Sequence, residues 1–165
     1  MRLNPLIWSA GVSAFKQSVD LPRGTLALGY AGLLPQLAAL VLVVAGGEWA
    51  WIALASSHAY ASLIFSFLGG VWWGQALQTS NPPSWVLPIA VMPSLIGLAL
   101  FLPWTLGWPW PGPSLLWLGL LIAASPLVDR ALGFHEHAWM RLRWHLSLGL
   151  GGLSVMIAVI ALSGR

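Results

Sequence analysis

Five long apolar stretches separated by short linkers dominate the pattern of this chain. They occupy residues 25–45, 50–78, 85–104, 114–128 and 142–163. About twenty apolar residues in a helix cross the hydrocarbon core of a bilayer, so each stretch is a candidate membrane span. The linkers contain typical helix breakers, namely Gly46-Gly47, Asn81-Pro82-Pro83 and Pro111-Gly112-Pro113. The pattern predicts an all-α fold, an integral membrane bundle of five transmembrane helices.

Composition supports a membrane location. Hydrophobic residues make up 58% of the 165 residues and charged residues only 7%, whereas soluble domains carry about 25% charged residues. A chain of this length cannot hide so much apolar surface inside itself, so lipid must cover much of it. The seven Lys and Arg form no basic stripe on a soluble face, which excludes nucleic-acid binding. The absence of cysteine excludes disulfides and thiolate chemistry.

Six of the seven basic residues fall into two clusters that set the expected orientation, and only Arg165 is expected on the opposite side. Three precede the first span and three lie between the fourth and fifth spans, and five spans place both clusters on one side. They are Arg2, Lys16, Arg23, Arg130, Arg141 and Arg143. The positive-inside rule predicts a cytoplasmic N-terminus and a C-terminus on the opposite side. Residues 1–24 form a cytoplasmic segment, either a short interfacial helix or an unstructured tail, and residues 25–165 form the five-span domain.

Proline is frequent inside the expected spans, which predicts kinks. Pro35, Pro88, Pro93 and Pro126 each remove a helix hydrogen bond and free a carbonyl about one turn earlier. Pro88 and Pro93 together predict local irregularity in the third span. Two interpretations remain open: a bundle that bows outward around a cavity, or ordinary use of proline in membrane helices.

The second span carries a polar, small and aromatic face that we expect to point into the bundle. The residues at spacings of three and four are His58, Ser62, Ser66, Gly69, Gly70 and Trp73. Pro35 and Gln36 on the first span, with Trp72 and Gln75 on the second, complete the candidate ligand-binding set. Trp73 is the expected ligand-contacting aromatic and Trp72 its support. The competing interpretation is structural, since such groups also form interhelical hydrogen bonds.

Catalytic and metal-binding patterns are weak. The four acidic residues lie outside the expected spans or at their edges, and no nucleophile motif is present, so an enzyme is not indicated. His135 and His137 flank Glu136, but residues two apart on a helix point to opposite sides. Even with His145 added, we predict no metal site there, and nothing identifies a cofactor. Arg141 and Arg143 before the last span are expected to contact lipid headgroups.

Three stretches resemble a known family. They are residues 28–35 (LGYAGLLP), residues 66–74 (SFLGGVWWG) with Tyr60 before them, and residues 139–143 (WMRLR). The chain is similar here to the small multi-spanning membrane family of unknown function that includes mitochondrial transmembrane protein 69 and many proteobacterial proteins. The resemblance implies a helical protein of the inner membrane and brings no catalytic residues with it.

A slighter resemblance concerns residues 81–88 (NPPSWVLP). They look like a loop of the tryptophan-rich sensory protein family, whose five-span members bind porphyrins and sterols. The similarity in size and tryptophan content is architectural.

Two functional hypotheses follow. The first is a non-enzymatic membrane protein that binds or carries a small hydrophobic or amphipathic ligand between the first three spans. The second is an interaction or assembly subunit whose glycine-rich helix face docks another membrane protein or a second copy of this chain.

Overall fold

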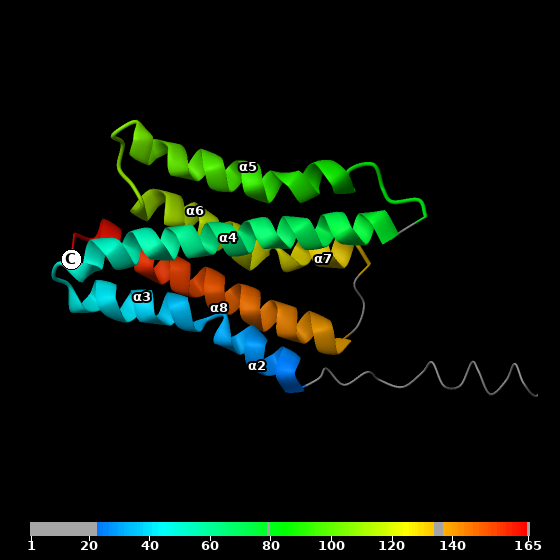
Figure 1. Ribbon diagram of the computed structural model, residues 1–165, viewed down its shortest axis with the longest axis horizontal. Coiled ribbons are helices and arrows are strands. Elements are labelled where there is room, and N and C mark those ends of the chain that lie inside the picture. Colours follow the sequence, from blue (N-terminus) through cyan, green and yellow to red (C-terminus); the bar gives the residue numbers. More distant parts are fainter. Residues whose placement is uncertain (1–22, 79, 134–136, 165) are drawn as a thin grey trace, which may run out of the picture.

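The computed structural model describes residues 23–78, 80–133 and 137–164 and shows an all-helical bundle (Figure 1). The helices are α2 (Arg23–Ala31), α3 (Leu34–Ala45), α4 (Trp49–Gln78), α5 (Val86–Thr105), α6 (Gly112–Ala124), α7 (Pro126–Ala131) and α8 (His137–Leu162). Five helical segments are long and apolar enough to span a membrane, which confirms the fold class and the number of spans. Residues 1–22 of the expected N-terminal segment 1–24 lie outside the described residues, as do His135 and Glu136.

The fourth and fifth spans come closer together along the chain than expected. The fourth runs over Gly112–Ala131 and the fifth over His137–Leu162, so the fifth begins five residues before residue 142. Hydropathy ends the fourth span just before Asp129 and begins the fifth just before Arg143, whereas both residues lie within the observed spans and are buried.

Two spans are interrupted, each just before a proline. The first span breaks at Gly32 and Leu33 between α2 and α3, and Pro35 lies in the first turn of α3. The fourth span breaks at Ser125, and Pro126 begins α7. Proline is well suited to a first helical turn because no backbone N–H is needed there. These breaks are the proline kinks expected of the fold.

The third span differs from expectation, because α5 continues through Pro93 and Pro103 as one helix. Pro88 lies in the first turn of α5, where it costs no intrahelical hydrogen bond. The prolines of the third span therefore do not divide it into two helices.

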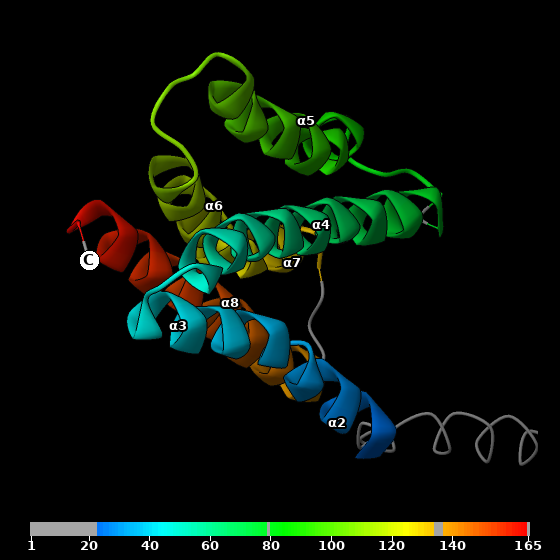
Figure 2. The ribbon, with the colours of Figure 1, turned by 60° about the vertical axis from the view of Figure 1, so that its left-hand side comes forward.

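α4 lies at the centre of the bundle and contacts α3, α5, α6 and α8. α5 forms an outer layer beyond α4, and α3 lies beside α8 (Figures 1 and 2). α2 precedes the break in the first span; it contacts α8 and diverges from α4 (Figure 2). This divergence leaves space between α2 and α4, where the cavity described below is found.

Glycines set the closest helix crossings. A Cβ added to Gly151 in α8 would lie 2.6 Å from the carbonyl oxygen of Gly119 in α6 and 2.9 Å from the Cβ of Ala123. A Cβ on Gly69 in α4 would overlap the carbonyl oxygen of Ala90 in α5. Small residues of this kind let membrane helices approach closely and pack without a hydrophobic driving force.

A buried hydrogen-bonded node joins three helices near the middle of the bundle. The Gln36 side chain on α3 is fully buried, and its Nε2 donates to Ser57 Oγ on α4 at 2.7 Å and to Ser154 Oγ on α8 at 2.8 Å. Interhelical hydrogen bonds in membranes contribute about 0.6–2 kcal/mol each. The node fixes α3 against both neighbours and keeps polar atoms away from lipid.

We predict that Gly151→Ala destabilises the bundle, because the added methyl group has to displace the backbone of α6. Overpacking of this kind costs about 1–3 kcal/mol. The matched control is Gly152→Ala, where a Cβ meets nothing within 4 Å and helix propensity favours alanine. Unfolding in mixed micelles measures the free energy of unfolding of both variants. Equal stability of the two variants would contradict the observed crossing.

Candidate functional site

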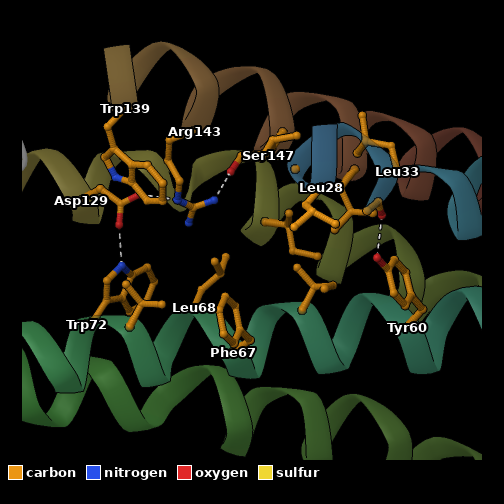
Figure 3. A pocket seen from close by; sticks show the side chains of 17 residues that line it. Leu28, Leu33, Tyr60, Phe67, Leu68, Trp72, Asp129, Trp139, Arg143 and Ser147 are labelled. Atoms are coloured by element: carbon orange, nitrogen blue, oxygen red, sulfur yellow. Dashed lines mark hydrogen bonds and ion pairs between the residues drawn. The ribbon is translucent and has the colours of Figure 1, made fainter. Parts of the chain in front are cut away.

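A cavity of about 330 Å³ lies between α2, α4 and α8, closed at the back by residues from α6 and α7 (Figure 3). Its walls are almost entirely apolar. The main wall residues are Leu28, Leu33, Ile64, Phe67, Leu68, Val71, Ile122, Leu146 and Leu150. Polar groups are confined to the two ends of this cavity: Asp129, Arg143 and Ser147 at one, Tyr60 at the other (Figure 3).

The first polar end is a buried ion pair. Arg143 Nε lies 2.6 Å from Asp129 Oδ2, and the Asp129 residue is only 2% exposed. Trp72 Nε1 on α4 donates to Asp129 Oδ1 at 2.6 Å. The pair therefore joins α7 and α8 and, through Trp72, also holds α4 (Figure 3).

Two serines accept hydrogen bonds from the Arg143 guanidinium. Its Nη1 donates to Ser147 Oγ one helical turn further along α8 at 2.6 Å, and its Nη2 donates to Ser125 Oγ at 3.1 Å. Ser125 lies at the break between α6 and α7, and its hydroxyl donates to the Ile122 carbonyl. Ser125 at the break is thus a partner of the guanidinium, and the short helix that carries Asp129 begins directly after it.

The second polar end lies at the other helix break. Tyr60 OH on α4 donates to the Gly32 carbonyl oxygen at 2.6 Å, between α2 and α3. Near this break Leu28 is 77% exposed, and Phe67 on α4 is 66% exposed. Because these two wall residues also face the outside of the bundle, the cavity opens sideways toward the region that lipid occupies.

The structure places Trp72, and not Trp73, at the cavity. Trp72 is buried and lines it, whereas Trp73 is 41% exposed on the outside of α4. Gly70 is also exposed, and a Cβ there meets nothing within 4 Å. Of the expected ligand-binding set, only Trp72 lines the cavity.

The other members of that set are dispersed. Gln36 belongs to the three-helix node, Pro35 is exposed beside it, and Gly69 packs against α5. Ser62 and Ser66 face Gly97 of α5, within the same α4–α5 contact. Gln75 is half-buried near the end of α4.

His58 lies away from the cavity, within an aromatic cluster. It is 2% exposed, and its ring packs edge-on against Trp110 with 5.0 Å between the ring centroids. Trp110 in turn contacts Trp51, Phe101 and Trp104. The cluster closes the opposite end of the bundle from the ion pair.

The two arginines expected at lipid headgroups differ in placement. Arg141 is exposed, as headgroup contact requires, whereas Arg143 is 9% exposed and engaged with Asp129. The expectation for Arg143 does not agree with its position, because its charge is neutralised inside the bundle. His137 begins α8, and His145 Nδ1 lies 3.0 Å from Tyr30 OH.

Sequence reasoning misses most of the residues around the cavity. Hydropathy puts Asp129 at a span edge, and no motif singles out Ser125 or Ser147. Tyr60 and Trp139 stand out only within the stretches that resemble the family, without a role assigned to them. One signal is present in the sequence: an acidic residue ends the fourth span and a basic residue begins the fifth. Ionisable residues at membrane depth generally pair with one another, which makes Asp129 and Arg143 natural partners.

Comparison with known proteins gives one family. The model of the family described as "Protein of unknown function (DUF3429)" matches residues 21–160. Transmembrane protein 69 of Xenopus tropicalis is 41% identical over 81 residues, which cover 47% of this chain and 32% of that protein. The chain thus spans about a third of the length of this curated relative. No solved structure matches.

We predict that Arg143→Gln destabilises the protein strongly, because it leaves the Asp129 carboxylate buried without its counter-charge. Removing one partner of a buried ion pair costs about 3–5 kcal/mol. Arg141→Gln is the matched control, since it removes the same charge from an exposed position two residues away; there we expect a change within about 0.5 kcal/mol. Equivalent unfolding curves for the two variants would contradict a buried pair.

Proposed function

The chain belongs to the DUF3429 family of membrane proteins, and we propose that it binds a small, predominantly apolar molecule taken up from the lipid phase. The observation that carries the proposal is the cavity between α2, α4 and α8, which is apolar along its walls and open at its side. Small-molecule sites typically have volumes of about 300–1,000 Å³, with apolar walls and a few placed polar groups. At about 330 Å³ this cavity lies in that range.

The way the cavity is formed also supports binding. The break at Gly32 and Leu33 turns α2 away from α4, and the Tyr60 hydrogen bond to Gly32 holds the break in place. Membrane proteins tolerate interrupted helices where the freed backbone groups find partners in protein. Here the Gly32 carbonyl at the break accepts a hydrogen bond from Tyr60, which supports the position of the break beside the cavity.

The alternative is docking of a second membrane protein or copy. The observation in its favour is that Gly70 and Gly74, four residues apart on α4, have no neighbour within 4 Å of an added Cβ. A pair of glycines at this spacing is a common surface for helix association in membranes. Under this alternative Gly70→Leu should change the size of the complex, whereas a substitution that fills the cavity should leave that size unchanged.

Photolabelling tests the binding proposal directly. The probe is tetradecane carrying a diazirine, added to the purified protein in lipid nanodiscs, with labelled peptides mapped by mass spectrometry. We expect preferential labelling of the segments around Leu28 and Phe67. Ile64→Trp fills the cavity from α4 and should lower this labelling about tenfold, since a larger side chain occupies the volume that the probe needs.

The control is Leu63→Trp, which adds the same ring at the neighbouring position. Leu63 is 69% exposed and is not part of the cavity wall, so labelling should be unchanged. Even labelling over all lipid-facing helices, or an equal loss in both variants, would overturn the proposal. An effect of Gly70→Leu alone, on complex size, would favour the docking alternative.

We further propose an orientation in the inner membrane, with the N-terminus in the cytoplasm. Its support is the charge distribution: Arg23, Arg130 and Arg141 lie at one end of the bundle, where α2 begins and α7 is followed by α8 (Figure 1). The only described acidic residue besides Asp129 is Glu48, at the α3–α4 connection of the other end. A cytoplasmic position for the arginine-bearing end follows from the positive-inside rule.

Single-cysteine labelling tests this orientation, and the native chain contains no cysteine to interfere. In intact cells with a permeable outer envelope, Glu48→Cys should react with an impermeant maleimide. Arg141→Cys should react only after the inner membrane is disrupted. Both positions are exposed, so a failure to react reports the side of the membrane. The reverse pattern would refute the orientation.

A further inference from the structure

The residues at the ion-pair end of the cavity restrict the chemistry of the ligand's head group. Asp129, Arg143 and Ser147 line the cavity together with Trp139, while the rest of its wall is apolar apart from Tyr60 at the other end. The indole of Trp139 lies beside the ion pair at this end (Figure 3). A molecule that fills the cavity lengthwise therefore meets the ion pair and its donors at one tip only.

From this arrangement we propose that the ligand has a neutral head group with a carbonyl acceptor, which binds beside the Asp129–Arg143 pair. The inference rests on the proposed function, because it assigns the chemistry of the same cavity. Its first support is charge balance. Arg143 and Asp129 lie 2.6 Å apart and neutralise each other, so the cavity end carries no net charge.

A third charge would disturb this balance. An anionic head would leave the site with a net negative charge and a cationic head with a net positive one, each within the membrane. Uncompensated charge at membrane depth is costly, and the cost falls on either sign. A neutral head avoids it.

The second support is the supply of donors. A guanidinium has two N–H groups on each terminal nitrogen. Within the described part of the chain, Nη1 of Arg143 has Ser147 as its partner and Nη2 has Ser125, which leaves one further N–H on each. Arg143 has no acceptor to offer, so a ligand oxygen is the complementary group. A carbonyl provides such an oxygen without charge.

Competition against the diazirine-tetradecane probe tests the head group. The competitors share one chain length: tetradecane, 2-tetradecanone, tetradecanoic acid and tetradecylamine. Nanodiscs of ether-linked lipids are used, because ester carbonyls of ordinary phospholipids would compete. We expect the ketone to displace the probe at about tenfold lower concentration than tetradecane, as one added hydrogen bond allows. The acid and the amine should compete less well than the ketone.

A double variant links this preference to the ion pair. Asp129→Leu with Arg143→Met removes both charges together, and replacement of a buried pair by apolar residues of similar size is often tolerated. The ketone should then lose its advantage, with equal competition by ketone and alkane. If this variant does not yield folded protein, the infrared band of an isotope-labelled ketone carbonyl decides the matter in the native chain. Hydrogen bonding should move the band to lower frequency than in empty nanodiscs.

The outcomes separate the two proposals. If no competitor displaces the probe, or no site-specific labelling exists, the binding function itself fails. If tetradecane and the ketone compete equally in the native chain, the cavity binds but the head-group inference is wrong. That inference is also wrong if the acid or amine competes best, if the double variant keeps the ketone's advantage, or if the carbonyl band does not move.

Discussion

The buried pair of Asp129 and Arg143 is the constraint on which the functional end of this bundle depends. Two charges inside a membrane protein are costly apart and acceptable together, provided that their remaining hydrogen-bonding groups are satisfied. Here Trp72 donates to the carboxylate, and Ser125 and Ser147 accept from the guanidinium. The five residues come from α4, the α6–α7 break, α7 and α8. One electrostatic requirement thus fixes the mutual position of three spans and creates polarity at one tip of an apolar cavity.

The helix breaks serve this arrangement. The break in the fourth span lies at Ser125, whose hydroxyl accepts from Arg143, and the short helix bearing Asp129 follows it directly. In the first span α3 packs against α4 whereas α2 contacts α8, and the cavity lies between α2 and α4. In both places a proline in the following turn makes the interruption inexpensive. Close glycine crossings and the Gln36 node hold the remaining helices together around these two irregular spans.

The fold could be predicted from the sequence and the site could not, for physical reasons that particular residues illustrate. Span number and span position follow from hydropathy, which is a local property. Which of two adjacent tryptophans faces inward depends on the partners available: Trp72 finds Asp129, whereas Trp73 remains at the surface. Gly69 and Gly70 likewise differ only in their neighbours, since α5 covers the first and not the second. A carboxylate lowers the local hydropathy, so a hydropathy pattern puts Asp129 at a span edge. In the structure Arg143 of the next span pairs with this carboxylate and allows it to be buried.

The most direct measurement of the central claim is the distance between the side-chain carboxyl carbon of Asp129 and the guanidinium carbon of Arg143 in a lipid bilayer. Solid-state NMR of protein labelled at these carbons measures it without altering the chain. An ion pair in direct contact predicts a separation of about 4 Å and a guanidinium protected from exchange with water. A separation beyond about 7 Å, with rapid solvent exchange at Arg143, would exclude hydrogen-bond contact and contradict the account.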